Sequence, residues 1–405
     1  MIYFIILGAL LFLTFYYDYC QNRQGRLFWY AVIMVMLILV AGLRYRIGTD
    51  SIRYENYYED LHTLTNLRGD DFKDTRFAPL YIILASVCRT ITSDFTLLQM
   101  VIAIIVNGTV FYFFYRNTTH IFLAATFYYI CLYLNLNTEV IREALAVCVF
   151  LWAWPFFRKG QWLLYYLMCV LAFFFHVSAI VMALLPIFWI PGIRWFFTFG
   201  RQTYFIVLAL IAVGFFVQIY FFDFIQAIAF TENMAERAEV YKKSDLGGNT
   251  LNIVGALGEI FKLVLYPLLA LYFLNKGKSK ETLSSEHGLL KMEMMTLMSI
   301  YTAALTLGIA ILSRYQNYFM FFAIATVSTC VFSELPGKGR KRYRVKFVMW
   351  VAVLLPLFAM QIYSLYFANY NKSGTLKNYM TYYPYYHRLD PQEDPDRENV
   401  IRYSR

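Results

Sequence analysis

Charged residues are scarce in this chain: Asp, Glu, Lys and Arg make up only 15% of its 405 residues, against 60% hydrophobic and 20% aromatic residues. Soluble domains carry about a quarter charged residues, so this composition excludes an ordinary water-soluble protein. A bilayer core about 30 Å thick needs about 20 mostly apolar residues per helical crossing, and such runs recur along nearly the whole chain. We therefore predict an all-α, polytopic integral membrane protein.

Common motifs for cofactors and metals are also missing. The six cysteines show no C-x-x-C spacing and no histidine partner at metal-ligand spacing, and we interpret them as small buried hydrophobic residues. The sequence has no P-loop, no dinucleotide fingerprint and no H-E-x-x-H pair. Neither a cofactor nor a metal is expected.

The hydrophobic runs predict about 12 transmembrane helices in a single membrane domain over 1–405. We interpret 161–190 as two helices separated at His176; one long tilted helix over 161–189 is the alternative, and it would reverse the side of every later loop. The short apolar segment 77–92 is expected to lie in the membrane interface. The predicted crossings are 2–17, 27–43, 95–115, 121–136, 140–157, 161–175, 177–190, 203–222, 251–274, 293–312, 316–333 and 347–367.

The distribution of Lys and Arg predicts the orientation, because basic residues favour short cytoplasmic loops. Six short loops on one side contain 17 basic residues and four acidic ones. The opposite side has the long segments 44–94, 223–250 and 369–405, in which acids and bases nearly balance. Both termini are therefore expected on the outer side of the membrane. The net charge of +10 reflects this bias and implies no nucleic-acid partner.

The first outward segment begins with two arginines, Arg44 and Arg46, followed by a turn at Gly48 to Asp50 and by Tyr54. Arginine and tyrosine both favour the headgroup layer, so anchoring is one interpretation. The arginines lie, however, on the side where the positive-inside bias does not call for them, and a guanidinium binds two phosphate oxygens at once. A phosphate or pyrophosphate site at headgroup height is the other interpretation.

A second cluster, Glu139, Arg142 and Glu143, is expected at the outer start of a helix. The spacing places Arg142 and Glu143 on the helix face of Glu139, and acids in a first turn suit the helix dipole. Arg142 needs another explanation, because an ionisable residue inside a membrane segment ordinarily faces a bundle interior or a wet cavity.

Two further candidates lie at outward breaks in the apolar pattern. His176 is either a hydrogen-bonded structural residue or an imidazole that accepts a proton from a sugar hydroxyl. Arg314 marks the turn before Tyr318. The four arginines at 44, 46, 142 and 314 are expected at one depth, which favours a single anion-binding cavity that opens outward.

These residues resemble the motifs of the EpsG-type, Wzy-like polymerases of bacterial surface polysaccharides. The resemblance is carried by Gly42 to Asp50 with Tyr54 downstream, by Ile141 and Arg142, by Phe175 to Ile180, and by Arg314 to Tyr318. Three positions depart from the family pattern: Glu139 and Glu143 replace amides beside Ile-Arg, and Ala78 replaces an acid before Pro79. The departures leave Asp50, Glu139 and Glu143 as alternative bases to His176.

The resemblance implies a glycosyltransferase without cofactor or metal that polymerises lipid-linked repeat units for exopolysaccharide, capsule or O-antigen. Glycan would move from undecaprenyl pyrophosphate to the next lipid-linked unit at the outer face of the inner membrane. The implied catalytic residues are His176, Asp50 and Arg142, and the implied substrate-binding residues are Arg44, Arg46, Arg142, Arg314, Tyr54, Tyr318 and Glu139. Membrane lipid, a chain-length regulator and a flippase are candidate partners. A flippase for the lipid-linked unit and a glycan ligase are the alternative functions.

Overall fold

In the computed structural model, every element of regular structure among the described residues is a helix, as the composition predicts. Two isolated antiparallel β-bridges occur beside these helices. One pairs Arg44 with His387, and the other pairs His387 with Asp390. The structure describes residues 2–73, 77–227, 260–276, 286–307, 314–331 and 378–403, together with single positions at 258, 312, 348, 351, 352, 355, 356 and 359.

Contacts divide the chain into two compact units, Met1–Ala183 with Arg344–Arg405, and Leu184–Tyr343. The single membrane domain over 1–405 stays a prediction. The first unit contains the helices α1 (Ile2–Leu13), α2 (Arg26–Gly42), α3 (Ser51–Asp60), α4 (Pro79–Ile91), α5 (Thr96–Asn117), α6 (Ile121–Tyr128), α7 (Ile141–Lys159), α8 (Trp162–Phe175) and α19 (Pro395–Tyr403).

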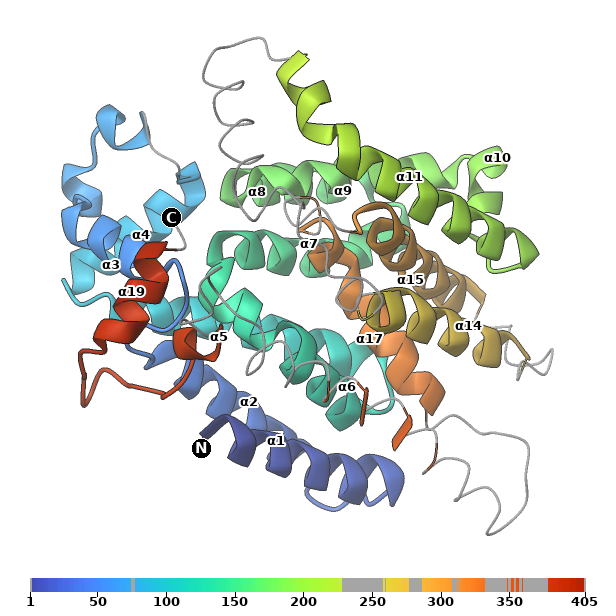
Figure 1. Cartoon of the computed structure of the whole chain (residues 1–405), viewed down its shortest axis with the longest axis horizontal. Helices are drawn as coiled ribbons and strands as arrows, with labels where there is room; N and C mark the ends of the chain where they lie inside the picture. Colours follow the sequence, from blue (N-terminus) through green and yellow to red (C-terminus); the bar gives the residue numbers. More distant parts are fainter. Residues whose placement is uncertain are drawn as a thin grey trace. The chain divides into compact units, whose positions relative to one another are not determined.

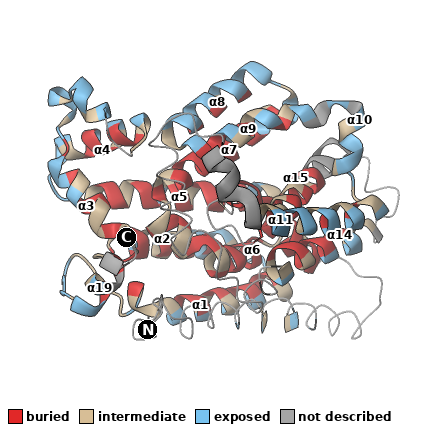
Figure 2. Cartoon of the chain, turned by 45° about the horizontal axis from the view of Figure 1, so that its top comes forward, coloured by how far each residue is buried: buried red, intermediate tan, exposed pale blue. Residues whose placement is uncertain are grey.

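Helices α5 and α7 form the core of the first unit (Figure 1), and α2 and α8 pack against them. The residues of α5 and α7 are largely buried, whereas α8 exposes most of its side chains (Figure 2). An exposed apolar face such as that of Leu163, Leu167 and Val170 on α8 suits contact with lipid, because lipid does not penalise apolar surface.

The segment that follows α6 remains helical but widens into two π-helical stretches, Tyr129–Tyr133 and Asn135–Glu139. A closed set of buried hydrogen bonds fixes its far end to α5. Asn107 donates to Asn137 Oδ1 at 2.9 Å and accepts from the Tyr128 hydroxyl at 3.0 Å, while Asn137 donates to the same hydroxyl at 3.0 Å. Because buried polar groups are costly unless bonded, this network gives Glu139 a defined position.

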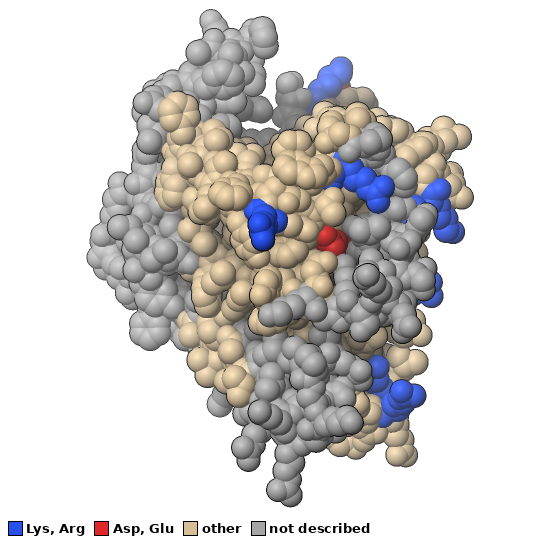
Figure 3. Space-filling model, turned by 90° about the vertical axis from the view of Figure 1, so that its right-hand side faces the viewer, with Lys and Arg blue, Asp and Glu red and all other residues tan. Residues whose placement is uncertain are grey.

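Two loops are in contact at the end of the first unit where α1 stops. The distribution of Lys and Arg assigns both loops to the same side of the membrane. Asp18 pairs with Arg26 at 2.9 Å and accepts the Leu123 N–H at 2.8 Å, and Arg26 also donates to the Thr119 carbonyl. In the view of Figure 3, most of the described charged side chains are Lys or Arg. The loops are therefore grouped as predicted; their orientation relative to a bilayer stays a prediction.

Helix α8 ends at Phe175, and His176 adopts an extended conformation (φ −159°, ψ 133°) before the 3-10 turn Val177–Ala179 and α9 (Ile180–Leu184). The break at His176 is thus present, and a continuous helix over 161–189 is not.

The second unit contains α10 (Pro191–Arg194), α11 (Arg201–Ala227), α14 (Tyr266–Lys276), α15 (Glu286–Leu305) and α17 (Gln316–Val331). Helices α15 and α17 pack closely and share a buried hydrogen bond of 2.8 Å between the Thr296 and Thr326 hydroxyls. Helix α17 is buried on nearly every side, consistent with a central position in this unit.

Two of the described helical segments, Ile2–Tyr19 and Thr96–Asn117, are long and apolar enough to cross a membrane by length and composition. The other apolar helices are shorter, and most of the predicted crossing 347–367 and the start of 251–274 lie outside the described residues. The figure of 12 crossings stays a prediction.

Candidate functional site

The candidate site lies at the end of the first unit at which α2 stops and the first outward segment begins. Gly48 has φ +102°, and a Cβ atom there would lie 2.9 Å from both Cβ and the carbonyl oxygen of Thr138. Only glycine adopts this conformation at no steric cost, so the predicted turn at Gly48 to Asp50 is present and packs directly on the end of the π-helical segment.

Glu139 connects three parts of this end of the molecule. Its two oxygens accept the Thr49 N–H at 3.1 and 3.0 Å, and it also accepts the hydroxyls of Thr49 and Tyr382, the latter at 2.8 Å. Removal from water raises the pKa of Glu139, although these hydrogen bonds favour the ionised form. Glu139 thus holds the turn and the C-terminal segment together.

The predicted shared face of Glu139, Arg142 and Glu143 is wrong. Glu139 ends the π-helical stretch, Val140 leaves the helical conformation (φ −109°, ψ 45°), and α7 begins at Ile141. The i, i+3 spacing therefore does not describe one helix. Glu139 contacts Thr49 and Tyr382, whereas Arg142 donates to a different residue, as described below.

Arg44 is buried, with 4% of its surface exposed. One of its terminal nitrogens donates to the Ala41 carbonyl, and Nε has no hydrogen-bond partner within the described part of the chain. No described carboxylate lies within ion-pair distance of it. Burial lowers the pKa of the Arg44 guanidinium, but an arginine stays protonated at neutral pH.

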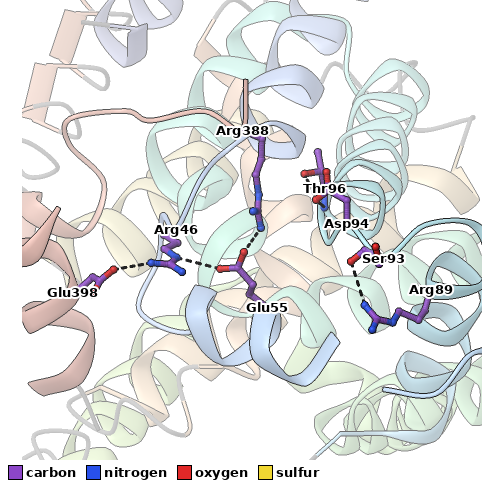
Figure 4. A network of polar contacts seen from close by, with 8 residues as sticks. All are labelled: Arg46, Glu55, Arg89, Ser93, Asp94, Thr96, Arg388 and Glu398. Atoms are coloured by element: carbon purple, nitrogen blue, oxygen red, sulfur yellow. Dashed lines mark hydrogen bonds and ion pairs between the residues drawn. The ribbon is translucent and has the colours of Figure 1, made fainter. Parts of the chain in front are cut away.

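Arg46 differs from Arg44 because it forms ion pairs with described carboxylates. It pairs with Glu55 at 3.3 Å and with Glu398 at 2.7 Å, and Arg388 donates to the second oxygen of Glu55 (Figure 4). Arg46 reaches these partners from a left-handed backbone conformation (φ 45°), which is uncommon outside glycine and often accompanies functional constraint.

Backbone bonds dock the C-terminal segment on the start of the first outward segment. Backbone bonds join Gly48 N–H to Thr381 O at 3.3 Å, Tyr45 N–H to Tyr386 O at 3.0 Å and Arg388 N–H to Leu43 O at 2.9 Å. Helix α19 lies near α3 (Figure 1). The start of the predicted outward segment 44–94 therefore contacts the described part of the predicted outward segment 369–405 within the first unit.

Arg142 lies against an aromatic residue of α3, Tyr54, and against Phe77, which precedes α4. Its Nε donates to the Tyr54 hydroxyl at 3.2 Å, and its guanidinium lies 4.9 Å from the Phe77 ring centre. Tyr54 is buried, and burial raises the pKa of its hydroxyl, so this hydroxyl stays neutral and can accept from Arg142. Cation–π contact and a hydrogen bond fix the guanidinium plane.

The two proton-acceptor candidates differ in their surroundings. His176 Nδ1 lies 2.6 Å from the Ser178 hydroxyl and accepts the Ser178 N–H at 3.2 Å. The side chain of Asp50 is 37% exposed and pairs with Arg53 at 3.2 Å. Because Nδ1 of His176 is committed to Ser178, proton transfer by this imidazole would use Nε2.

Arg314 and Tyr318 belong to the second unit. Arg314 accepts the Asn317 N–H through its carbonyl at 3.0 Å in the turn before α17, and Tyr318 is fully buried within that unit. Three of the four predicted arginines, at 44, 46 and 142, thus gather at one end of the first unit; a common cavity that includes Arg314 stays a prediction.

The sequence model of one protein family, the EpsG family, matches residues 26–387. The chain belongs to the EpsG family. Membership makes it a membrane protein that resembles polysaccharide polymerases, as the sequence motifs indicated. No curated protein and no solved structure matches the chain.

Sequence reasoning missed several residues of this candidate site, namely Glu55, Tyr382, His387, Arg388 and Glu398. They carry no motif, and the last two lie beyond the matched range. Their contacts with residues 43–55 link parts of the chain more than 300 residues apart, which no local pattern encodes.

Proposed function

We propose that this protein is a glycosyltransferase that polymerises lipid-linked oligosaccharide repeat units at the outer face of the bacterial inner membrane. The observation that supports this most strongly is Arg44, a buried guanidinium without a described carboxylate partner. A buried, uncompensated charge ordinarily costs several kcal/mol. An anionic substrate that binds there would offset that cost, and the pyrophosphate of undecaprenyl pyrophosphate is such an anion.

In the proposed reaction, the hydroxyl of the acceptor sugar attacks the anomeric carbon of the growing glycan. The new C–O bond forms as the bond to phosphate breaks, and the electron pair leaves with the pyrophosphate. Guanidinium groups at the leaving oxygens stabilise this charge. Arg44 and Arg142 are the proposed donors in the first unit, with Arg46 and Arg314 as further candidates.

The proton of the acceptor hydroxyl needs a base. His176, through Nε2, and Asp50 are the proposed acceptors. Glu139 is better suited to positioning, because both its oxygens already accept hydrogen bonds from Thr49. Tyr54 holds Arg142 and has a similar role, and Tyr318 stays a candidate for glycan contact in the second unit.

The test is Arg44→Lys, which keeps the charge but removes the planar fork that binds two oxygens. We expect a loss of about 2.7 to 4 kcal/mol of transition-state stabilisation, about a hundredfold to a thousandfold in rate, by analogy with an oxyanion-hole donor. A gel of extracted polysaccharide should show short or absent chains, and single lipid-linked units should accumulate at the outer face. Arg68→Lys, at an exposed arginine, is the matched control.

The site of accumulation separates the alternatives. A flippase defect would leave single repeat units at the inner face, and a ligase defect would leave long chains on their lipid carrier. Normal chain lengths in Arg44→Lys at equal protein abundance would contradict the proposed pyrophosphate site.

A further inference from the structure

His387 lies directly opposite Arg44 in the short antiparallel pairing between the first outward segment and the C-terminal segment. The hydrogen bonds of this pairing join the flanking residues, Tyr45 to Tyr386 at 3.0 Å and Arg388 to Leu43 at 2.9 Å. Arg44 and His387 therefore form a non-hydrogen-bonded pair, the arrangement in which opposite side chains approach most closely.

In such a pair the two side chains leave the backbone on the same face, with Cβ atoms about 4.5 to 5.5 Å apart. Arg44 Nε and His387 Nδ1 are both buried, and neither has a hydrogen-bond partner among the residues that the structure describes. The same holds for Nε of the adjacent Arg388. Buried polar atoms are ordinarily bonded, and each exception calls for a ligand or another explanation.

We propose that His387 completes a pyrophosphate subsite with Arg44, donating a hydrogen bond to a phosphate oxygen of the lipid-linked donor; this rests on the function proposed above. An imidazole and a guanidinium side by side offer N–H donors to one oxygen-rich anion, and bonds to charged oxygens are stronger than neutral ones. The C-terminal segment thereby contributes to the site itself.

The position of His387 assigns it to the leaving group and not to the acceptor. In the transition state, the attacking hydroxyl and the leaving oxygen lie in different directions from the anomeric carbon. Arg44 is proposed to bind the phosphate that carries the leaving oxygen. A side chain about 5 Å from Arg44 at Cβ lies on that side too. The acceptor proton is left to His176 or Asp50.

Several contacts that hold the C-terminal segment do not involve the His387 side chain. Arg388 bonds to Glu55, and its guanidinium lies 5.0 Å from the Tyr45 ring centre. The backbone bonds that flank His387 also involve no side chain of residue 387. Substitutions at His387 should therefore change the subsite while the docking is kept.

The experiment uses the full-length protein in lipid nanodiscs with inorganic pyrophosphate as the probe, and it measures the ligand-dependent rise in melting temperature across a concentration series. His387→Asn retains a donor close to the Nδ1 position, whereas His387→Leu retains only the bulk. We expect about tenfold to hundredfold weaker pyrophosphate binding in His387→Leu, with near-normal binding and polymerisation in His387→Asn. His62→Leu, at an exposed histidine, should bind as the wild type does.

The outcomes are distinguishable. If the wild type binds pyrophosphate through Arg44 and His387→Leu binds equally well, this inference is overturned and the proposed function stands. If both His387 variants bind normally but neither polymerises, His387 acts as a base and the subsite assignment is wrong. If the wild type does not bind pyrophosphate at all, the proposed site fails together with the inference.

Discussion

The carboxylate of Glu139 accepts the backbone N–H of Thr49 with both of its oxygens, at 3.1 and 3.0 Å, and the Thr49 hydroxyl in addition. These bonds fasten the turn after Arg46 to the end of the π-helical segment. Since Tyr382 donates to the same carboxylate, the loss of this one side chain should loosen the turn and the C-terminal segment together.

The first prediction is a pH dependence of stability that Glu139 causes. Its pKa is raised above the ordinary 4.5 by removal from water, so the folded protein favours the protonated form more than the unfolded chain does. The stability contributed by this preference is present below about pH 4.5 and is lost as the pH rises through the raised pKa. Relative to Glu139→Gln, the wild type should therefore become less stable as the pH rises.

Melting temperatures of wild type and Glu139→Gln in the same detergent, from pH 4.5 to 8, would measure this difference. Asp390→Asn, at an exposed acid, provides a control with little expected effect. If the melting temperature of the wild type, relative to that of Glu139→Gln, rose with pH, the predicted direction of the Glu139 pKa shift would be wrong. Polymerisation should fall in Glu139→Gln at every pH, because the amide cannot accept all the bonds that Thr49 and Tyr382 donate.

The second prediction concerns Gly48→Ala. The added Cβ would meet the Thr138 backbone at 2.9 Å, and the φ of +102° is unfavourable for any side chain. We expect destabilisation of about 1 to 3 kcal/mol, measured as a lower melting temperature, with a loss of polymer. Gly69→Ala should be nearly silent, because no atom lies within 4 Å of a Cβ there.

The third prediction is an energetic coupling between Glu55 and Arg388. Their side chains are only 8% and 19% exposed, so water screens the pair little. A double-mutant cycle with Glu55→Gln and Arg388→Met should give about 1 to 3 kcal/mol. The pair Lys73 and Asp70, 73% and 85% exposed, should give less than about 1 kcal/mol. Equal coupling in both pairs would show that burial does not strengthen the Glu55–Arg388 pair.

The fourth prediction tests the orientation with thiol labelling of intact cells. Cys20 is exposed in the predicted inward loop 18–26, and it should react with an impermeant reagent only after permeabilisation. A cysteine at Asp390, also exposed, should react from outside in a background where only the tested cysteine is present. Reaction of Cys20 from outside, with Asp390→Cys protected, would reverse the orientation.

Local patterns predicted much of this architecture. Apolar runs located the apolar helices of the first unit but not α3 or α19. The break in the apolar pattern between Phe175 and Val177 located the end of α8 at His176, and the Gly-Thr-Asp sequence located the turn at Gly48. Each depends on backbone preferences and side-chain transfer energies that act over a few residues. For the same reason these patterns gave the positions of Arg44 and Arg142 but not the surroundings of either.

The sequence predictions failed where a departure from regular α-helix geometry, or a contact between distant parts of the chain, determined the position of a side chain. The spacing of Glu139 and Arg142 assumed a regular α-helix, whereas the π-helical stretch and Val140 place the two side chains on different elements. His387 opposes Arg44 only because two distant segments pair, and composition alone made the C-terminal segment a neutral outward tail.

The pairing of Arg44 with His387 also has a consequence for biosynthesis. The first of these residues leaves the ribosome long before the second, and at about 5 to 20 residues per second the interval is on the order of tens of seconds. During that time the Arg44 segment has been made but its partner has not. The proposed binding site should therefore assemble only after residue 387 has been synthesised, which would keep shorter nascent chains from engaging lipid-linked substrate.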